Sequence, residues 1–411
     1  MAERLLGLSE YFGLKRNLAV LLAVTFLLGM GEELWTRFMP KYIELLGASV
    51  LIVGLYGTLK DVLDAFYQYP GGILSDRLGH RKALVVFNIL AIFGYVTYLL
   101  SGSWPMVFVG TLFVAAWSSL SLPATFSIVG DSLPQSKRAI GFATQSIIRR
   151  IPIIIAPPLG GLLLARAGFG PGMKVGFAVT IVLAVIAVFV QRRFYTKADA
   201  PPKQPTPVVR ESLSDQVKCM DPRLKRLLVA DILARFAEGI PKAFIVLYVL
   251  NIAGASTEGF GLLTSLSMAV SVAVYIPIAK LADASRNKNQ YVTLTFIFFA
   301  LFPLVLALSR SVPMLALAFI VMGLREIAEP ARKAMIVDLS RAHCAGRDVG
   351  TYYSLRQIAV MPASLIGGLL WRVSPQTPFY VAFVVGVIGA AVFAILSAGQ
   401  RRNSGETGCT G

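Results

Sequence analysis

Sixteen charged side chains lie at least six residues inside stretches of this chain that are otherwise long and apolar. Eight are acidic and eight are basic: Glu32, Glu33, Asp61, Asp64, Asp231, Glu238, Glu326 and Glu329, and Arg37, Lys60, Arg149, Arg150, Arg235, Lys242, Arg325 and Arg356. A charge near the middle of a bilayer costs at least ~2.5–3.5 kcal/mol on insertion scales when it faces lipid. We therefore expect these groups to face one another or water, and the equal numbers of each sign favour mutual pairing.

Carboxyl groups inside a membrane protein can gain and lose protons. Guanidinium groups there keep their charge and can bind anions. Burial raises the proton affinity of a carboxyl group and a nearby arginine lowers it, so a change of surroundings can load or unload a proton. Four carboxyl groups are candidates for this proton chemistry: Glu32, Asp61, Asp64 and Glu326. Six side chains are candidates for binding a small molecule: Arg149, Arg356, Glu32, Glu238, Arg325 and Glu326. The two arginines Arg149 and Arg356 predict an anionic or zwitterionic molecule.

Helical spacing places several of these charges on common faces. Four of them recur at i, i+4, i+7 and i+11: Asp231, Arg235, Glu238 and Lys242. That spacing forms a single stripe along one helix. Some pairs can instead serve only to hold helices together. We favour this structural role for Asp231, Arg235 and Lys242, towards the ends of their run, and leave it open for Glu33 and Arg37.

The elements that must position these charges are predicted to be membrane-spanning helices. The chain is 56% hydrophobic and 15% charged, with a mean hydropathy of +0.69, which excludes an ordinary soluble domain. Twelve apolar runs are long enough to cross a hydrocarbon core of ~30 Å. They span 18–45, 50–74, 83–101, 105–130, 139–165, 173–191, 225–251, 257–281, 291–309, 313–337, 348–371 and 377–399. The fold class is thus an all-α membrane protein with twelve transmembrane helices.

The basic residues predict an orientation. The loops on one side of the predicted membrane carry 26 Lys and Arg, and the loops on the other side carry five. Basic loops stay in the cytoplasm, so we expect both termini there. The net charge of +17 follows from this topology and does not indicate nucleic-acid binding. The three cysteines (Cys219, Cys344 and Cys409) fall on the cytoplasmic side, where no disulfide is expected.

The chain also repeats itself at a constant offset of 207 residues. Matching pairs include Pro70 with Pro277, Asp76 with Asp283, Asp131 with Asp338, Gly160 with Gly367, and Arg149 with Arg356. This repeat predicts two pseudo-symmetric six-helix halves with a ligand site at the seam between them. We place the halves at 1–191 and 223–400, joined by a Pro-rich cytoplasmic linker at 192–222 and followed by a disordered tail at 401–411.

A glycine-rich and basic segment joins the second and third predicted helices. It runs Gly71-Gly72-Ile73-Leu74-Ser75-Asp76-Arg77-Leu78-Gly79-His80-Arg81-Lys82. Gly79 permits a tight turn, and the basic cluster anchors the loop at the cytoplasmic surface. The segment resembles the G-x-L-a-D-r-x-G-r-k signature of the major facilitator superfamily, and its repeat copy keeps Asp283. The residues that the resemblance implies for conformational change are Gly72, Asp76, Arg77, Gly79, Arg81 and Asp283. The loop 131–141 resembles a second pattern of that family.

The resemblance implies a function as well as a fold. A member of this family is expected to be a secondary active transporter that works by alternating access, here for a small charged or zwitterionic solute and coupled to protons. Its expected partners are the solute, protons and the lipid bilayer, with no nucleic acid, no cofactor and no metal. We expect a monomer in the cell membrane that is not an enzyme.

Three other functions stay open at this point. A multidrug or metabolite–proton antiporter is favoured by Ala156-Pro157-Pro158-Leu159-Gly160-Gly161, which is similar to part of an antiporter motif. Thr111, however, stands where many proton-coupled members carry an arginine. An uncoupled facilitator or sensor of the same fold is the second alternative. A polytopic membrane enzyme is the third and is disfavoured, because neither histidine lies in a predicted span and there is no H-E-x-x-H or G-x-S-x-G motif.

Overall fold

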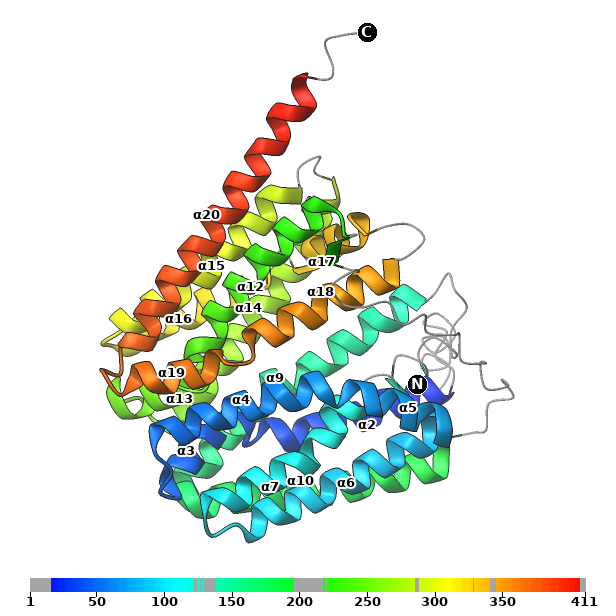
Figure 1. Ribbon diagram of the computed structural model, residues 1–411. Helices are drawn as coiled ribbons and strands as arrows, with labels where there is room; N and C mark the ends of the chain where they lie inside the picture. Colours follow the sequence, from blue (N-terminus) through cyan, green and yellow to red (C-terminus); the bar gives the residue numbers. More distant parts are fainter. Residues whose placement is uncertain are drawn as a thin grey trace. The chain divides into compact units, whose positions relative to one another are not determined.

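The computed structural model describes residues 16–121, 124–125, 128, 138–195, 217–218, 220–284, 288–327, 329–340 and 345–406. Regular structure in these ranges is helical, with no β-strand (Figure 1). The helices fall into two compact units. Unit 1 contains residues 1–49, 59–206 and 256–265, and unit 2 contains residues 50–58, 207–255 and 266–411. The first turns of the helix at 50–66 therefore belong to unit 2, and the first turns of the helix at 257–284 belong to unit 1.

Unit 1 is built from the helices of the first sequence half. They are α2 (Arg16–Glu33), η1 (Thr36–Phe38), α3 (Met39–Leu45), the second part of α4 (Val50–Phe66), α5 (Gln68–Leu78), α6 (His80–Leu100), α7 (Trp104–Ala115), the π-helical turn η2 (Ala116–Leu120), α9 (Arg138–Ala167) and α10 (Phe169–Phe194). Among these, α10 packs against α2 and α6, and α2 packs against α9. The first turns of α14 (Thr257–Ala284) complete the unit.

Unit 2 holds the helices of the second sequence half. They are α12 (Pro222–Lys242), α13 (Ile245–Leu247), the π-helical turn η4 (Tyr248–Ile252), the rest of α14, α15 (Lys288–Leu308), α16 (Val312–Leu324), α17 (Glu329–Asp338), α18 (Ala345–Val360), α19 (Ala363–Trp371) and α20 (Thr377–Glu406). Here α20 packs against α12 and α15, and α12 also contacts α18 and α19. A core of buried apolar side chains, including Phe296, Tyr352 and Phe393, fills the space between these helices.

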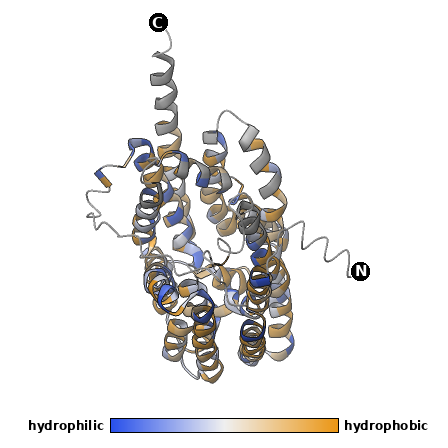
Figure 2. Ribbon diagram, turned by 90° about the vertical axis from the view of Figure 1, so that its right-hand side faces the viewer, coloured by the Kyte–Doolittle hydropathy of each residue, from blue (hydrophilic) through white to orange (hydrophobic). Residues whose placement is uncertain are grey.

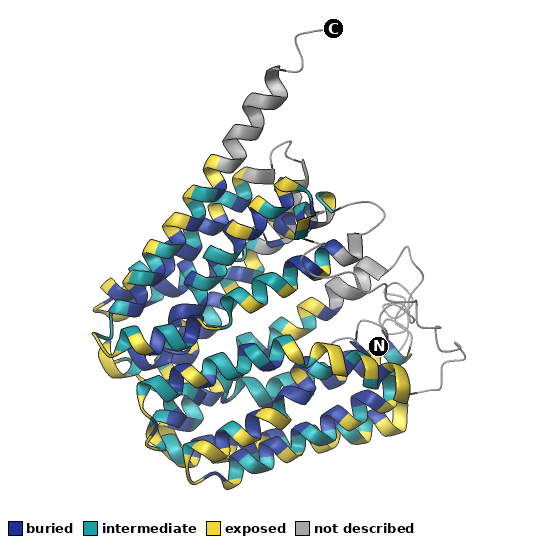
Figure 3. Ribbon diagram, in the orientation of Figure 1, coloured by how far each residue is buried: buried dark blue, intermediate teal, exposed yellow. Residues whose placement is uncertain are grey.

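Helical elements occupy each of the twelve predicted apolar runs within the described residues. Seven helical stretches there are long and apolar enough to cross a membrane, and the apolar helices Trp104–Leu120 and Val312–Leu324 are shorter. Large apolar side chains on α6, α10 and α20 point outwards, as Phe93, Phe189 and Ile395 show with 60%, 65% and 71% exposure. Exposed apolar surface of this extent is what a lipid-facing helix presents (Figures 2 and 3). The all-α membrane fold is thus confirmed, whereas the number of twelve crossings stays a prediction.

Helix breaks follow from proline. The first run is broken after Glu33 and resumes at Met39, because Pro40 has no N–H to donate to the carbonyl of Thr36. The eleventh run is broken between Val360 and Ala363, at Pro362. Helix α20 continues to Glu406, so the tail is helical over 401–406 rather than disordered as expected. Most of the predicted linker, 196–216, lies outside the described residues.

The break in the first run is closely packed. A Cβ atom added at Gly160 of α9 would lie 1.9 Å from the backbone carbonyl oxygen of Leu34. Only glycine permits this approach, since a Cβ there would overlap the backbone directly. The polypeptide next to Glu32 is therefore held against α9 by backbone contact.

Candidate functional site

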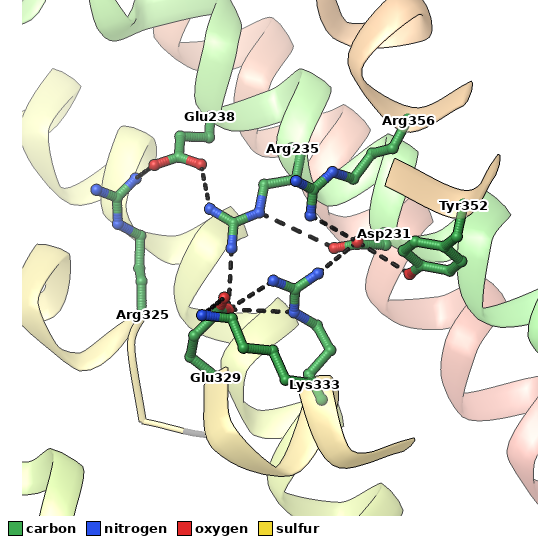
Figure 4. A network of polar contacts seen from close by, with 9 residues as sticks. Asp231, Arg235, Glu238, Arg325, Glu329, Lys333, Tyr352 and Arg356 are labelled. Atoms are coloured by element: carbon green, nitrogen blue, oxygen red, sulfur yellow. Dashed lines mark hydrogen bonds and ion pairs between the residues drawn. The ribbon is translucent and has the colours of Figure 1, made fainter. Parts of the chain in front are cut away.

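Charged side chains from three helices of unit 2, and from the turn after α16, form one connected network (Figure 4). At its centre is Asp231 of α12, which is fully buried. Its Oδ2 accepts hydrogen bonds from Arg332, from the hydroxyl of Tyr352 at 2.9 Å and from Nη1 of Arg356 at 3.2 Å. The Nε of Arg235 lies 3.9 Å from Oδ1. Three guanidinium groups thus surround a single carboxylate.

Glu329 of α17 is the second carboxylate of the network. Its Oε2 accepts from Nη2 of Arg235 at 3.0 Å and from Nη2 of Arg332 at 2.6 Å. The ammonium group of Lys333 lies 3.5 Å from Oε1. Arg235 and Arg332 therefore link Glu329 to Asp231, which joins α12 to α17.

Glu238 is the third carboxylate and lies at the more accessible end. It accepts from Nη1 of Arg235 at 2.9 Å and pairs with Nη1 of Arg325 at 3.4 Å. Two aromatic rings of α15 lie against the guanidinium groups of these arginines. Arg235 lies 4.8 Å from the ring centre of Phe299, and Arg325 lies 4.8 Å from that of Phe302. Cations at such distances are attracted to the ring face.

The network explains how unit 2 tolerates so many charges. Each carboxylate contacts at least two cations, and the side chains of Arg332 and Asp231 are each only 1% exposed. Burial of such an ion pair must be compensated by hydrogen bonds, and Oδ2 of Asp231 accepts three of them, whereas Oδ1 accepts none from the described residues. Mutual pairing of the charges, predicted from their balance of sign, is what unit 2 displays.

Arg332 is a buried member of the network that was not among the candidates predicted from the sequence. It lies five residues from the end of the tenth predicted run, 313–337, outside the sixteen charges considered. The structure places it inside α17 and buries it between Asp231 and Glu329. A signal was present, since Arg325, Glu329 and Arg332 follow the i, i+4, i+7 spacing of one helix face.

Unit 1 holds its acidic side chains in a different way. Glu32, at the end of α2, is half-buried and accepts a 2.5 Å hydrogen bond from the hydroxyl of Tyr95 on α6. No basic side chain of the described residues lies within 4.0 Å of its carboxylate. The charges of Lys60 and Arg149 act on it from farther away. Glu32 is thus held by a neutral partner.

Further acidic side chains of unit 1 lie on α4 and at the last residue of α2. Asp64 accepts a hydrogen bond from the hydroxyl of Ser119, which belongs to the π-helical turn η2. Asp61, one turn earlier, is 5% exposed. Glu33 pairs with Arg37 at 3.1 Å, as the i, i+4 spacing suggested. Single π-helical turns inside α-helices are frequent at functional sites.

The structure distributes the predicted binding residues over both units. Glu238, Arg325 and Arg356 belong to the network of unit 2, and the charge of Glu326 acts on Arg235 there. In unit 1, Arg149 lies on α9 with an exposed side chain. The idea that Arg149 and Arg356 act as a matched pair stays a prediction.

The signature segment forms the turn between α5 and α6. Gly79 has φ +79°, a conformation that favours glycine and ends α5 sharply. The hydroxyl of Ser75 lies 2.7 Å from Nδ1 of His80 across this turn. Gly72 is half-buried, Asp76 and Arg77 are exposed, and Arg81 lies in the first turn of α6. The side chain of Asp283, the loop 131–137 and the three cysteines lie outside the described residues.

Comparisons with known proteins agree with this architecture. The profile of the Major Facilitator Superfamily matches residues 21–228 and 227–408. The chain is 21% identical to an uncharacterised MFS-type transporter of Methanocaldococcus jannaschii, covering 93% of this chain and 95% of that protein. It is 23% identical to multidrug resistance protein MdtG of Proteus mirabilis, and the match covers 87% of this chain and 89% of that protein.

Solved structures show the same fold at lower identity. A crystal structure of the peptide transporter POT in complex with sulfate superposes with a TM-score of 0.75 and 17% identity, covering 95% of this chain and 96% of that one. A crystal structure of a mutant of the nucleoside transporter NupG superposes with a TM-score of 0.74 and 12% identity. The match covers 92% of this chain and 99% of that one. Since the family profile matches both halves of a helical, membrane-spanning chain, the protein belongs to the Major Facilitator Superfamily and is an integral membrane transporter rather than an enzyme.

Proposed function

We propose that this secondary transporter moves a small charged or zwitterionic solute by alternating access, and that Glu32 carries the coupled proton. The protein acts as a monomer in the cell membrane with both termini in the cytoplasm. The candidate solute-binding side chains are Arg356, Arg325, Glu238 and Glu326 in unit 2, and Arg149 in unit 1.

The observation that carries this proposal is the contrast between the carboxylates of the two units. Protonating Asp231 or Glu329 would leave buried arginines without a counter-charge, which is strongly unfavourable. Protonating Glu32 breaks no ion pair within 4.0 Å among the described residues, since its bonded partner is the Tyr95 hydroxyl. Glu32 is therefore the acid best suited to gain and lose a proton during each cycle. Asp61 and Asp64 of α4 are the further candidates.

Arg356, which contacts the network at Asp231, supports a charged solute. Arg356 makes a single 3.2 Å bond to Asp231 and lies 4.6 Å from the ring centre of Tyr353, with its side chain 16% exposed. Asp231 keeps Arg332 and Tyr352 if Arg356 turns away. Arg356 can thus exchange its protein partner for an anionic group of the solute at low cost.

Proton coupling is tested in proteoliposomes that enclose a pH-sensitive dye. A thermal-shift screen of metabolites and drugs first selects a solute that stabilises the purified protein. We expect this solute to drive proton movement in the wild type, and Glu32→Gln to abolish proton movement. The matched control is Glu33→Gln, which removes the neighbouring carboxylate paired with Arg37. Proton movement that survives Glu32→Gln unchanged would refute the role of Glu32.

Multidrug efflux is the second candidate function. It is favoured by the likeness to MdtG proteins of several enterobacteria, at 23–25% identity over most of both chains. Expression in bacteria that lack their major efflux pumps distinguishes the candidates. An efflux protein would lower the accumulation of ethidium and raise drug resistance, whereas a transporter of charged metabolites would change neither.

A further inference from the structure

We propose that Tyr95 is a positioning residue that holds the Glu32 carboxylate and sets the pH at which it exchanges its proton. The inference rests on the proposed function, because it takes Glu32 as the proton-carrying group. It adds a side chain from α6, a helix that neither the repeat nor the distribution of charges singles out.

The contact between the two residues is specific. Tyr95 is fully buried, and its hydroxyl donates to Oε1 of Glu32 at 2.5 Å. A phenol hydroxyl donates one hydrogen bond, and that bond is strongest when the acceptor is an ionised carboxylate. Tyr95 therefore favours the deprotonated form of Glu32 without adding a charge.

Packing fixes the ring that carries this hydroxyl. The indole of Trp35 meets Tyr95 edge-on, with ring centres 6.2 Å apart. Trp35 is itself anchored, because its Nε1 donates to the hydroxyl of Thr180 on α10 at 2.9 Å. The ring of Tyr95 is thus packed against Trp35, which is itself bonded to α10, and this packing keeps the hydroxyl beside Glu32.

Other charges reach Glu32 from three elements. Glu33 follows it in the chain, Lys60 belongs to α4, and Arg149 belongs to α9. None of them is altered by a substitution at position 95. A change in the titration of Glu32 on replacing Tyr95 with Phe therefore reports the lost hydrogen bond.

Tyr98 provides a matched control on the same helix. It lies three residues after Tyr95, is 1% exposed and also packs edge-on against Trp35, with ring centres 5.4 Å apart. Its hydroxyl lies 2.8 Å from the hydroxyl of Thr111 and does not bond to Glu32. Tyr98→Phe thus removes a buried phenol hydroxyl from the same aromatic cluster and spares the carboxylate.

The experiment is an infrared pH titration of the purified full-length protein in lipid nanodiscs. The C=O stretching band of a protonated carboxyl group is followed, and its loss in Glu32→Gln identifies the contribution of Glu32. We expect Tyr95→Phe to move the midpoint of this band to higher pH by about one unit, a tenfold change in proton affinity. Tyr98→Phe is expected to leave the midpoint in place.

The outcomes separate this inference from the proposed function. If Glu32→Gln removes no titrating band, Glu32 is not the proton carrier and the proposed function fails. If the band is present but both Phe variants shift it equally, or neither does, the role of Tyr95 alone is overturned. Should Tyr95→Phe not fold, wild-type protein with isotope-labelled tyrosine gives the same test. A tyrosine C–O band must then change at the pH where the carboxyl band titrates, and its failure to do so overturns the inference.

Discussion

Arg332 is the largest side chain that unit 2 buries completely. It donates to Asp231 of α12 and to Glu329 of its own helix, so it balances two carboxylates that have little access to water. Removing one member of such a buried group leaves the others uncompensated. The stability of unit 2 should therefore depend on this residue far more than on its exposed neighbour Lys333.

We predict that Arg332→Met lowers the stability of the protein by about 3–5 kcal/mol, because Asp231 and Glu329 lose a fully buried partner. Thermal unfolding of detergent-purified protein measures the change. Lys333→Met is the control, since its side chain is 56% exposed and its contact with Glu329 is worth about 1 kcal/mol or less. Equal losses in the two variants would contradict the assigned role of Arg332.

At the scale of helices, two hydroxyl groups at equivalent places of the repeat satisfy backbone atoms near prolines. In unit 1, Ser265 of α14 donates to the carbonyl of Ile154 in α9. That carbonyl lacks its usual donor, because residue 158 is proline and has no N–H. In unit 2, Thr58, which is 207 residues before Ser265, accepts from the N–H of Leu365 in the first turn of α19.

A double-mutant cycle tests the first of these contacts. Ser265→Ala alone should cost about 1–3 kcal/mol, since the Ile154 carbonyl is left without a donor. In a Pro158→Ala background, the new N–H at 158 can bond to that carbonyl, so Ser265→Ala should cost about 1 kcal/mol less. Thermal unfolding supplies the four values. Ser309→Ala is the control, because its hydroxyl donates to the carbonyl of Val305 in the last turn of α15, and it should show no coupling to Pro158→Ala.

At the scale of the whole molecule, the basic loops predict which face of the membrane each connection occupies. The imbalance of 26 against five Lys and Arg favours a single orientation. It predicts that the loops with Cys219 and Cys344, and the tail with Cys409, lie in the cytoplasm. The turn between α6 and α7, which contains the exposed Ser103, is assigned to the opposite side.

The native cysteines allow this orientation to be measured. In intact cells, a membrane-impermeant maleimide should not label Cys219, Cys344 or Cys409, and labelling should appear only after the cells are opened. Ser103→Cys in a variant without the three cysteines should label in intact cells. Labelling of the native cysteines in intact cells would reverse the proposed orientation.

Much of the candidate site followed from spacing, and the rest depended on contacts between helices. The stripe of Asp231, Arg235 and Glu238 was predicted because residues four and three apart share a helix face. The position of Arg332 was missed because hydropathy falls near the end of the tenth run. The link from Glu32 to Tyr95, which lies 63 residues further along the chain, left no local pattern to detect.

The sequence by itself determined the membrane-spanning helical class, the duplication and the family. In lipid every backbone group must form a hydrogen bond within the protein, so a long apolar run predicts a helix. The sequence also determined that the buried charges must find partners, since an isolated charge in lipid is too costly. The tertiary structure decided which partners they find. Unit 2 pairs its acids with arginines, whereas unit 1 gives Glu32 a tyrosine, because packing between helices far apart in the chain sets those contacts.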